Sequence, residues 1–250
     1  MIDFHSHVLP GIDDGAKDVE TSVAMIEESK RQGVTTIVCT PHYSGRKHSP
    51  ARFKEKRNAA YERLKPHIPE GIELRLGAEV FFPDDSVLSN EQLAMLTIED
   101  TRYVMLEFPF TPKYPERLFE RIESFIAETD CIPLIAHADR YPAVWKNPSI
   151  VSRLIDMGCV VQLNAEAFAD KGAKKLARVL LEKGMVHAVG SDMHNMAGRA
   201  PCMEKYVEGM RAFGLEAECD KIMSSAAEIL ADEVVRGDSK PIRKFLGKYF

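Results

Sequence analysis

Residues 1–39 read MIDFHSHVLPGIDDGAKDVETSVAMIEESKRQGVTTIVC, and this stretch predicts a strand, a helix and a second strand in that order. The first strand is the short apolar run at the start. Apolar residues then recur at helical spacing over 19–32, after Asp18 as an N-cap and before Gly33 as a stop. The β-branched run 35–39 is the second strand. This succession favours two parallel strands joined by a right-handed crossover.

The same alternation continues along the whole chain. Further strands are predicted at 72–76, 103–106, 132–136, 159–163 and 186–189, and helices at 50–65, 115–127, 149–157, 174–182, 203–212 and 216–235. About seven strands, nearly each followed by a helix, predict an α/β fold with a parallel sheet, closed as a barrel or, as second choice, open and doubly wound. No repeat, linker or change of composition divides the chain, so residues 1–250 are expected to form a single domain.

Composition is that of a globular protein and argues against three other classes. Hydrophobic residues make up 45% and charged residues 28% of the chain, as in ordinary folded domains. The formal net charge of -5 argues against nucleic acid as a partner. No apolar run approaches the roughly 20 residues of a membrane span, and no signal peptide is expected, because the first residues hold no basic segment followed by an apolar stretch. The five cysteines include no CxxC pair, which indicates a reducing, cytoplasmic location.

Ionisable and polar side chains follow the end of nearly every predicted strand. They are His5, His7, Asp14, His42, Glu79, Glu107, His137, Asn164, Glu166, Asp192 and His194. In a parallel barrel the carboxyl ends of all strands meet on one face, which carries the active site. These residues are therefore expected to share one pocket. The remaining histidines, His48, His67 and His187, lie away from strand ends and are interpreted as structural or solvated.

Imidazole and carboxylate groups in this number indicate bound metal. Together they suit divalent ions such as zinc, manganese or iron. Carboxylates packed this densely need cations between them, because like charges so close cannot all stay ionised. The candidates exceed what one ion uses, which indicates at least two ions and favours three, with Glu79 able to bridge a pair. Taken singly, Asp14 is typical of a turn and Glu107 of a surface charge, so the inference depends on the joint pattern.

Two arginines lie just beyond the candidate ligands. Arg140 follows His137, and Arg199 follows His194. One interpretation is a pair of surface salt bridges, which are common and contribute little. The other is a bidentate grip on a phosphate group.

Several of these segments together resemble the polymerase-and-histidinol-phosphatase (PHP) superfamily, and within it the bacterial protein-tyrosine phosphatases of capsule and exopolysaccharide clusters. The matching segments are 3–15 (DFHSHVLPGIDDG), 40–42 (TPH), 77–79 (GAE), 107–109 (EFP), 137–141 (HADRY) and 191–199 (SDMHNMAGR). The resemblance runs along the whole chain and implies a distorted (β/α)7 TIM-like barrel of the PHP fold. The chain departs from the family at Ala138-Asp139, where proline and glutamate are usual, with His137 and Arg140 still in register.

The resemblance also implies a site with three divalent metal ions, with Mn2+ expected and Fe or Zn as alternatives. One ion would be held by His5, His7, Glu79 and Asp192, a second by Glu79, Glu107 and His137, and a third by Asp14, His42 and His194. Arg140 and Arg199 match the family's phosphate-binding arginines. They are expected to act in catalysis together with Asp192 and His42.

The implied activity is hydrolysis of O-phosphotyrosine by a hydroxide held between metals, which attacks phosphorus in line. The implied partner is the phosphotyrosine-containing tail of a bacterial tyrosine kinase that controls capsular and exopolysaccharide synthesis. Contact with the membrane would at most be peripheral, through that kinase. A cysteine nucleophile has no support, because no Cys-x5-Arg loop occurs.

Three other hypotheses differ from this one in the substrate, in whether the chain is a catalyst at all, or in the type of bond hydrolysed. A small phosphomonoester such as histidinol phosphate, or a nucleic-acid end, would use the same site. A catalytically vestigial kinase-binding module would not use it. A metal amidohydrolase is disfavoured because no eighth strand is predicted.

The short basic and aromatic tail at about 240–250 is expected to pack or to be disordered, with a contact to anionic membrane or kinase as the alternative. The oligomeric state stays open.

Overall fold

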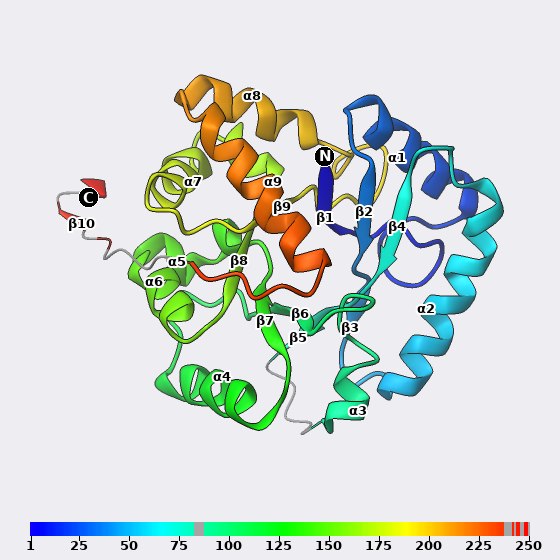
Figure 1. The fold of residues 1–250 in the computed structure, drawn as a ribbon, viewed down its shortest axis with the longest axis horizontal. Helices are drawn as coiled ribbons and strands as arrows, with labels where there is room; N and C mark the ends of the chain where they lie inside the picture. Colours follow the sequence, from blue (N-terminus) through cyan, green and yellow to red (C-terminus); the bar gives the residue numbers. More distant parts are fainter. Residues whose placement is uncertain (83–87, 238–241, 243, 246–247, 250) are drawn as a thin grey trace.

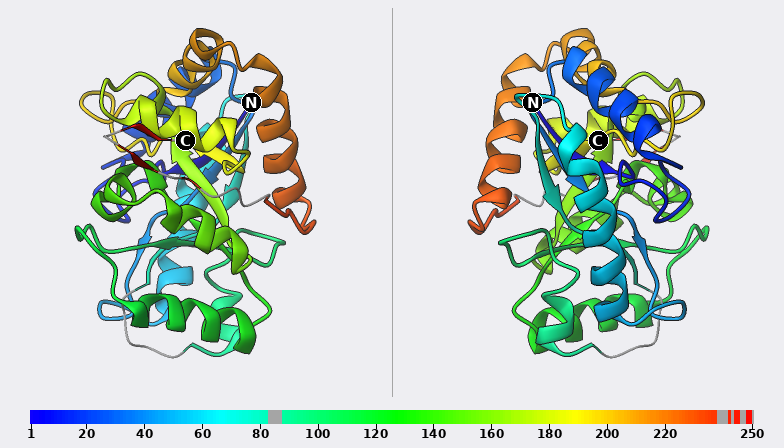
Figure 2. Two further views of the ribbon diagram at one scale, coloured as in Figure 1. Left: turned by 90° about the vertical axis from the view of Figure 1, so that its left-hand side faces the viewer. Right: turned by 90° about the vertical axis from the view of Figure 1, so that its right-hand side faces the viewer.

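The computed structural model describes residues 1–82, 88–237, 242, 244–245 and 248–249. Its centre is a curled parallel sheet surrounded by helices (Figures 1 and 2). The strands are β1 (Ile2–Ser6), β2 (Thr36–Cys39), β3 (His42–Tyr43), β4 (Glu73–Leu76), β5 (Glu79–Phe81), β6 (Tyr103–Glu107), β7 (Ile132–Ile135), β8 (Val160–Asn164) and β9 (Ala188–Gly190). They follow one another around the sheet in chain order, as repeated strand–helix units require.

Two of the expected strands are each followed, after a break of two residues, by a short further strand that was not predicted. β2 and β3 are separated by Thr40 and Pro41, and β4 and β5 by Gly77 and Ala78. Proline has no N–H to give to a ladder, which accounts for the first break. At the second break the carbonyl of Gly77 accepts a hydrogen bond from the buried Arg57 Nη1 at 2.9 Å. With each pair of pieces taken as one strand, the sheet has the seven strands predicted from the sequence.

The sheet closes on itself at the carboxyl ends of its first and last strands. The segment after β9 runs beside the end of β1: Asp192 N donates to His5 O at 2.8 Å, and His7 N donates to Met193 O at 3.0 Å. Gly190 permits this approach, since a Cβ there would lie 2.4 Å from the Cβ of His5. The closed, distorted barrel was the first choice from sequence and is confirmed, and the open doubly wound sheet was wrong.

The seven helices expected from the sequence are all present around the sheet, six of them with bounds within about one residue of the prediction. They are α1 (Val19–Arg31), α2 (Pro50–Leu64), α4 (Glu116–Glu128), α6 (Ser149–Asp156), α7 (Ala173–Glu182), α8 (Met203–Phe213) and α9 (Glu216–Leu230). α1 begins as predicted, with the Asp18 carboxylate accepting from Thr21 N at 2.8 Å. The short helices α3 (Asn90–Leu93) and α5 (Pro142–Lys146) were not predicted, because one turn shows no periodicity.

Apolar side chains fill the inside of the barrel below the strand ends. Phe4 of β1, Met105 of β6 and Leu134 of β7 are fully buried in one cluster with Ile229 of α9. α9 therefore covers the amino end of the barrel, and in Figure 1 it lies across β1 and β9. The polar side chains are left at the opposite, carboxyl end.

The last helix and last strand differ from the sequence prediction. The helix predicted at 216–235 ends at Leu230, because Asp232 takes a positive φ of 59° and its carboxylate accepts hydrogen bonds from Arg102 N and Nε. The strand predicted at 186–189 begins at Ala188 instead. Tyr103 also fixes the segment after α9, since its hydroxyl donates to Glu233 O at 2.6 Å.

Only part of the basic tail can be described. Ile242 is buried, and its carbonyl accepts from Ser149 Oγ at 2.7 Å. Strands β10 (Lys244–Phe245) and β11 (Lys248–Tyr249) form an antiparallel pair. The rest of the tail predicted at 240–250 lies outside the described residues. No helix in the described part of the chain is long and apolar enough to span a membrane.

Candidate metal centre

The candidate ligands, spread over nearly 190 positions of sequence, meet at the carboxyl end of the barrel. Three groups of side chains each have ligand atoms within 4.8 Å of one another. The groups are His7, Asp14, His42 and His194; His5, His7 and Asp192; and His42, Glu79 and Glu107. His137 joins them through Glu79. The predicted convergence is therefore present in the structure, whereas the role of each side chain as a ligand stays a prediction.

The innermost group is built on β1 and the residue that follows it, with His5 and His7 on the same side because they are two residues apart. Their Nε2 atoms are 3.2 Å apart. Glu79 Oε2 lies 3.4 Å from each of these nitrogens. Asp192 Oδ1 lies 3.6 Å from His5 Nε2 and 3.4 Å from His7 Nε2. Two imidazoles and two carboxylates thus face a common point among fully buried side chains.

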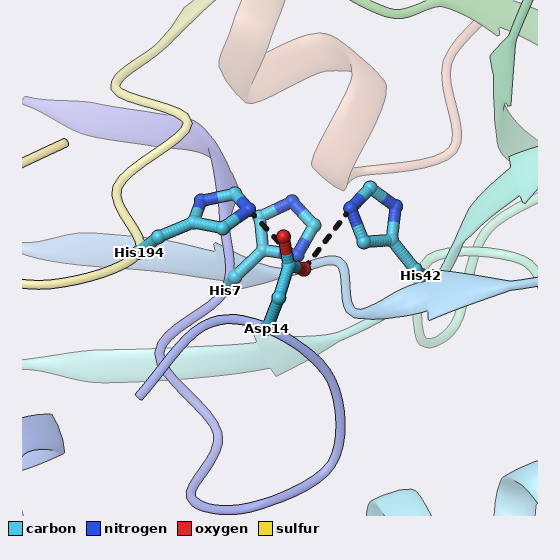
Figure 3. Close-up of side chains that lie close together, drawn as sticks. All are labelled: His7, Asp14, His42 and His194. Carbon is cyan, nitrogen blue, oxygen red and sulfur yellow. Dashed lines mark ion pairs between the residues drawn. The ribbon is translucent and has the colours of Figure 1, made fainter. Parts of the chain in front are cut away.

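A second group lies nearer the solvent. In Figure 3 the carboxylate of Asp14 lies between the rings of His42 and His194, with His7 beside them. Asp14 Oδ1 is 3.4 Å from His42 Nε2 and 3.6 Å from His194 Nε2. Asp14 is 66% exposed and His42 38% exposed, so this group is the part of the centre that a large molecule can reach.

Glu79 contacts histidines of all three groups through its two carboxylate oxygens. Its Oε1 lies 2.7 Å from His137 Nε2, and its Oε2 lies 2.9 Å from His42 Nδ1. Burial works to raise the pKa of Glu79, but the imidazoles of His5, His137 and His42 hold it well below its usual value. Burial, followed by repulsion from Glu79, raises the pKa of Glu107 to about 7. The two carboxylates thus compete for negative charge, and a bound cation would relieve this repulsion.

Two residues that support this centre were given no role from the sequence, although Asp13 was noted with Asp14 after the first strand. His7 Nδ1 donates to Asp13 Oδ2 at 2.7 Å, and the Gln162 side-chain oxygen lies 3.3 Å from His5 Nδ1. Partners of this kind fix the ring orientation of metal-binding histidines and leave Nε2 for the ion. Signals were present: Asp13 adjoins Asp14, and Gln162 is a polar residue within a buried strand.

The buried donor atoms of the centre fit divalent cations. Among the described residues, His194 Nε2 is buried and has no hydrogen-bond partner, and Glu79 Oε2 is buried among three imidazoles, with His42 Nδ1 at 2.9 Å. The other ring nitrogen of His194, Nδ1, lies 2.9 Å from the carbonyl of Asp192, which turns Nε2 toward Asp14. A buried polar atom without a partner costs about 1–3 kcal/mol, and a divalent cation bound here would satisfy His194 Nε2 together with the neighbouring carboxylates. Nitrogen and carboxylate donors suit zinc, manganese or iron.

Backbone conformation at two of these positions is unusual. His137 has φ 29° and Asp192 has φ 54°, values that non-glycine residues rarely adopt. Both are held by their surroundings, since His137 N donates to the Gln162 side chain at 2.6 Å and Asp192 N donates to His5 O at 2.8 Å. Such conformations concentrate at functional sites.

Both arginines singled out in the sequence contact the same carboxylate. Arg140 Nη1 donates to Asp192 Oδ2 at 2.7 Å, and Arg199 Nη2 lies 2.6 Å from the same oxygen. Asn164 Nδ2 donates to it at 3.1 Å. Asp192 therefore faces the histidines with one oxygen and the arginines with the other. Glu166, also at the predicted end of β8, points elsewhere and pairs with Lys205.

The departure from the family at Ala138-Asp139 leaves the Arg140 loop well held. The loop is a short 3-10 helix, η2 (Ala138–Arg140). The buried Asp139 Oδ1 accepts from Asn164 N at 2.8 Å, and its backbone carbonyl accepts from Trp145 Nε1. Burial raises the pKa of Asp139 to about 7. These bonds position Arg140 beside Asp192.

Comparisons with known proteins agree with this geometry. The family model described as "Capsular polysaccharide synthesis, CpsB/CapC" matches residues 1–231. Tyrosine-protein phosphatase CpsB of Streptococcus pneumoniae is 33% identical over 245 residues, covering 94% of this chain and 100% of that protein. Tyrosine-protein phosphatase YwqE of Bacillus subtilis (strain 168) is 35% identical over 211 residues, covering 80% of this chain and 79% of that protein.

The fold is also found among solved structures. A crystal structure from work on YwqE of Bacillus subtilis and CpsB of Streptococcus pneumoniae, described there as "unique metal-dependent tyrosine phosphatases", superposes with a TM-score of 0.82 at 25% sequence identity. The superposition covers 98% of this chain and 100% of that chain.

Proposed function

This chain belongs to the CpsB/CapC family, and we propose that it is a metal-dependent protein-tyrosine phosphatase. The observation that carries the proposal is the meeting of imidazole and carboxylate donors with two arginines on a single carboxylate, Asp192. Hydrolysis of a phosphate ester needs cations, which the imidazoles and carboxylates would hold, and N–H donors to the phosphoryl oxygens, which the arginines would supply.

The proposed cofactor is a set of three divalent ions. The sets of ligands are His5, His7, Glu79 and Asp192; Glu79, Glu107 and His137; and Asp14, His42 and His194. The short distances from Glu79 to His5, His7, His42 and His137 support its place between two of these sets. Mn2+ is the proposed physiological ion, with Fe and Zn as the alternatives that the same donors accept.

Bound divalent ions would supply a water of lowered pKa as the nucleophile and positive charge for the phosphoryl oxygens. The protein's own part is to hold donors in place. Asp13 and Gln162 fix the rings of His7 and His5, so that both Nε2 atoms face inward. The apolar interior below β1 excludes water from that side.

Arg140 and Arg199 would bind the phosphoryl group. Each contacts Asp192 through one terminal nitrogen of its guanidinium, which leaves other N–H groups of the fork for a second oxyanion. Their charge would stabilise the equatorial oxygens as the bond to the leaving group breaks. At 40% and 37% exposure they lie where a substrate can reach them.

The leaving group of phosphotyrosine needs little help from a proton-donating side chain. The conjugate acid of a phenolate has a pKa of about 10, so the phenolate departs with less help from a proton donor than an alkoxide needs. The site is accordingly rich in cation ligands and arginines. We infer that the substrate is phosphotyrosine on the tail of a bacterial tyrosine kinase that controls capsular or exopolysaccharide synthesis, and that the reaction takes place in the cytoplasm.

Substrate choice tests this proposal against the small-molecule alternative. The purified, Mn2+-loaded protein would be given a phosphotyrosine peptide, a phosphoserine peptide and histidinol phosphate at equal concentrations, with released phosphate as the readout. We expect turnover of the phosphotyrosine peptide to exceed the other two. Preferred turnover of histidinol phosphate would overturn the assignment. No turnover of any ester by the loaded protein would favour a vestigial binding module.

A further inference from the structure

A cleft of about 950 Å³ adjoins the proposed site. It runs between α5 and the loop 197–202 that precedes α8. Arg140, Asp192 and Arg199 are among the residues that line it, so a molecule whose phosphate is held by the arginines would extend into the cleft. Its volume is near the upper limit for small-ligand sites and exceeds what one phosphorylated amino acid needs.

Two exposed aromatic side chains line this cleft. Among the described residues the exposed large hydrophobic side chains are Phe110, Trp145, Met196 and Val234. Phe110 and Trp145, which are 46% and 37% exposed, both belong to the cleft. Exposed aromatic surface in a concave site is the usual mark of a binding site, because aromatic rings give large contact areas with little loss of side-chain entropy.

Phe110 lies beside the place where the ring of a phosphotyrosine would be. The guanidinium carbon of Arg140 is 5.2 Å from the centroid of the Phe110 ring, and the rings of Phe110 and His137 are 5.6 Å apart. A phenol ring attached to a phosphate beside Arg140 would therefore come within stacking distance of Phe110.

Trp145 forms a fixed apolar wall further along the cleft. Its Nε1 donates to the carbonyl of Asp139, and its six-membered ring packs over Gly172, where an added Cβ would lie 2.9 Å away. Charges of both signs also line the cleft: Lys205 pairs with Glu166, and Lys146, Asp170 and Glu204 are further lining residues. Because neither sign dominates, the apolar face of Trp145 is the feature that would select one kind of flanking residue.

We propose that this cleft binds the polypeptide on one side of the phosphotyrosine, with Phe110 against the phenol ring and Trp145 against a large apolar residue close to it in sequence. This inference rests on the proposed phosphatase function. It makes the chain selective for phosphotyrosine within a peptide whose flank is apolar, rather than for phosphotyrosine alone.

The test compares kcat/KM for three substrates: a phosphotyrosine peptide with leucine flanks, the same peptide with glycine flanks, and free O-phosphotyrosine. Trp145→Ala removes the wall. Gly198→Phe adds a bulky apolar side chain to the lining of the cleft, at an exposed glycine where a Cβ has no heavy atom within 4 Å. Val234→Ala is the matched control, since it removes an exposed apolar side chain at the amino end of the barrel.

We expect the wild type and Val234→Ala to prefer the leucine-flanked peptide over free O-phosphotyrosine by about tenfold, the scale of one well-packed anchor. Both cleft variants should bring this ratio close to one. Phe110→Leu should raise KM for all three substrates, because each carries the phenol ring.

Two results would overturn the proposed subsite. One is a wild type that hydrolyses free O-phosphotyrosine as well as the leucine-flanked peptide. The other is a preference that survives in both cleft variants. Either result would leave the phosphatase function standing. A wild type that hydrolyses none of the three substrates would instead refute the phosphatase function itself, and the two failures are thereby distinguished.

Discussion

His7 Nδ1 donates a hydrogen bond to Asp13 Oδ2 at 2.7 Å, so a carboxylate outside the proposed ligand sets holds the ring of a histidine inside them. The same oxygen accepts from the backbone N of His42 at 2.9 Å. Burial opposes ionisation of Asp13, but these bonds bring its pKa down to about 2. Asp13 therefore keeps its charge at neutral pH. It holds both the ring of His7 and the backbone of His42.

Replacing Asp13 should weaken metal binding without unfolding the protein. Asp13→Asn can still accept from the His42 backbone, but it loses the charge that orients His7. We expect metal affinity to fall about 10–100-fold, with activity recovered at higher Mn2+ concentration. Titration calorimetry with Mn2+ measures this directly. Asp18→Asn is the control, because asparagine caps α1 as well as aspartate does. Equal affinity in the two variants would show that Asp13 has no such role.

Substitution of Arg199 tests whether this arginine binds the phosphoryl group or only forms a surface salt bridge. Arg199→Ala should lower kcat/KM for a phosphotyrosine peptide by about 10²–10³, the usual effect of removing one donor to transition-state charge. Metal content should be unchanged. Arg199→Lys should lie between the two, because lysine keeps the charge but lacks the planar fork. Near wild-type activity in Arg199→Ala would favour the surface salt bridge instead.

His187 should make the protein less stable in mild acid. Its Nδ1 accepts from Val161 N at 3.1 Å, and Gly237 packs on its Nε2. Burial lowers its pKa from 6.5 to about 4. The unfolded chain therefore takes up a proton near pH 6.5 and the folded chain only near pH 4. The neutral His187 therefore makes its full contribution to the free energy of unfolding above pH 6.5. Up to about 3 kcal/mol of that free energy is lost as the pH falls to 4.

The measurement for His187 is urea unfolding at pH 7.5 and pH 5 in the wild type and in His187→Asn. Asparagine can accept the Val161 hydrogen bond but does not titrate. We expect the variant to lose less stability between the two pH values than the wild type. The difference between the proteins removes the contribution of the other histidines, and identical losses would contradict the assignment.

Much of the fold follows from the sequence because its signals are local. The helical period of 19–32, with Asp18 before it, gave the bounds of α1 to within a residue. What could not be predicted depends on distant partners. The end of α9 at Leu230 is set by Asp232 meeting Arg102, a contact across 130 residues. The break between β4 and β5 involves Arg57 in the same way.

The candidate site was predictable for a different reason. Parallel strands bring their carboxyl ends together whatever the details of the loops, so His5, Glu79 and His137 could be placed in one pocket from strand ends alone. The supporting bonds were not visible in this way. Gln162 reaches both His5 and His137 only because β8 lies beside β7, and the sharing of Asp192 by two arginines depends on its positive φ.

Metal content measured together with turnover tests the central claim most directly. The purified protein is assayed by elemental analysis and by hydrolysis of a phosphotyrosine peptide, before chelation, after chelation and after Mn2+ is restored. His5→Ala and Asp192→Ala are measured alongside, with circular dichroism to show that they fold. We expect about three ions per chain, activity lost on chelation and regained with Mn2+, and two folded but inactive variants. Full activity in metal-free protein, or in either variant, would contradict the account.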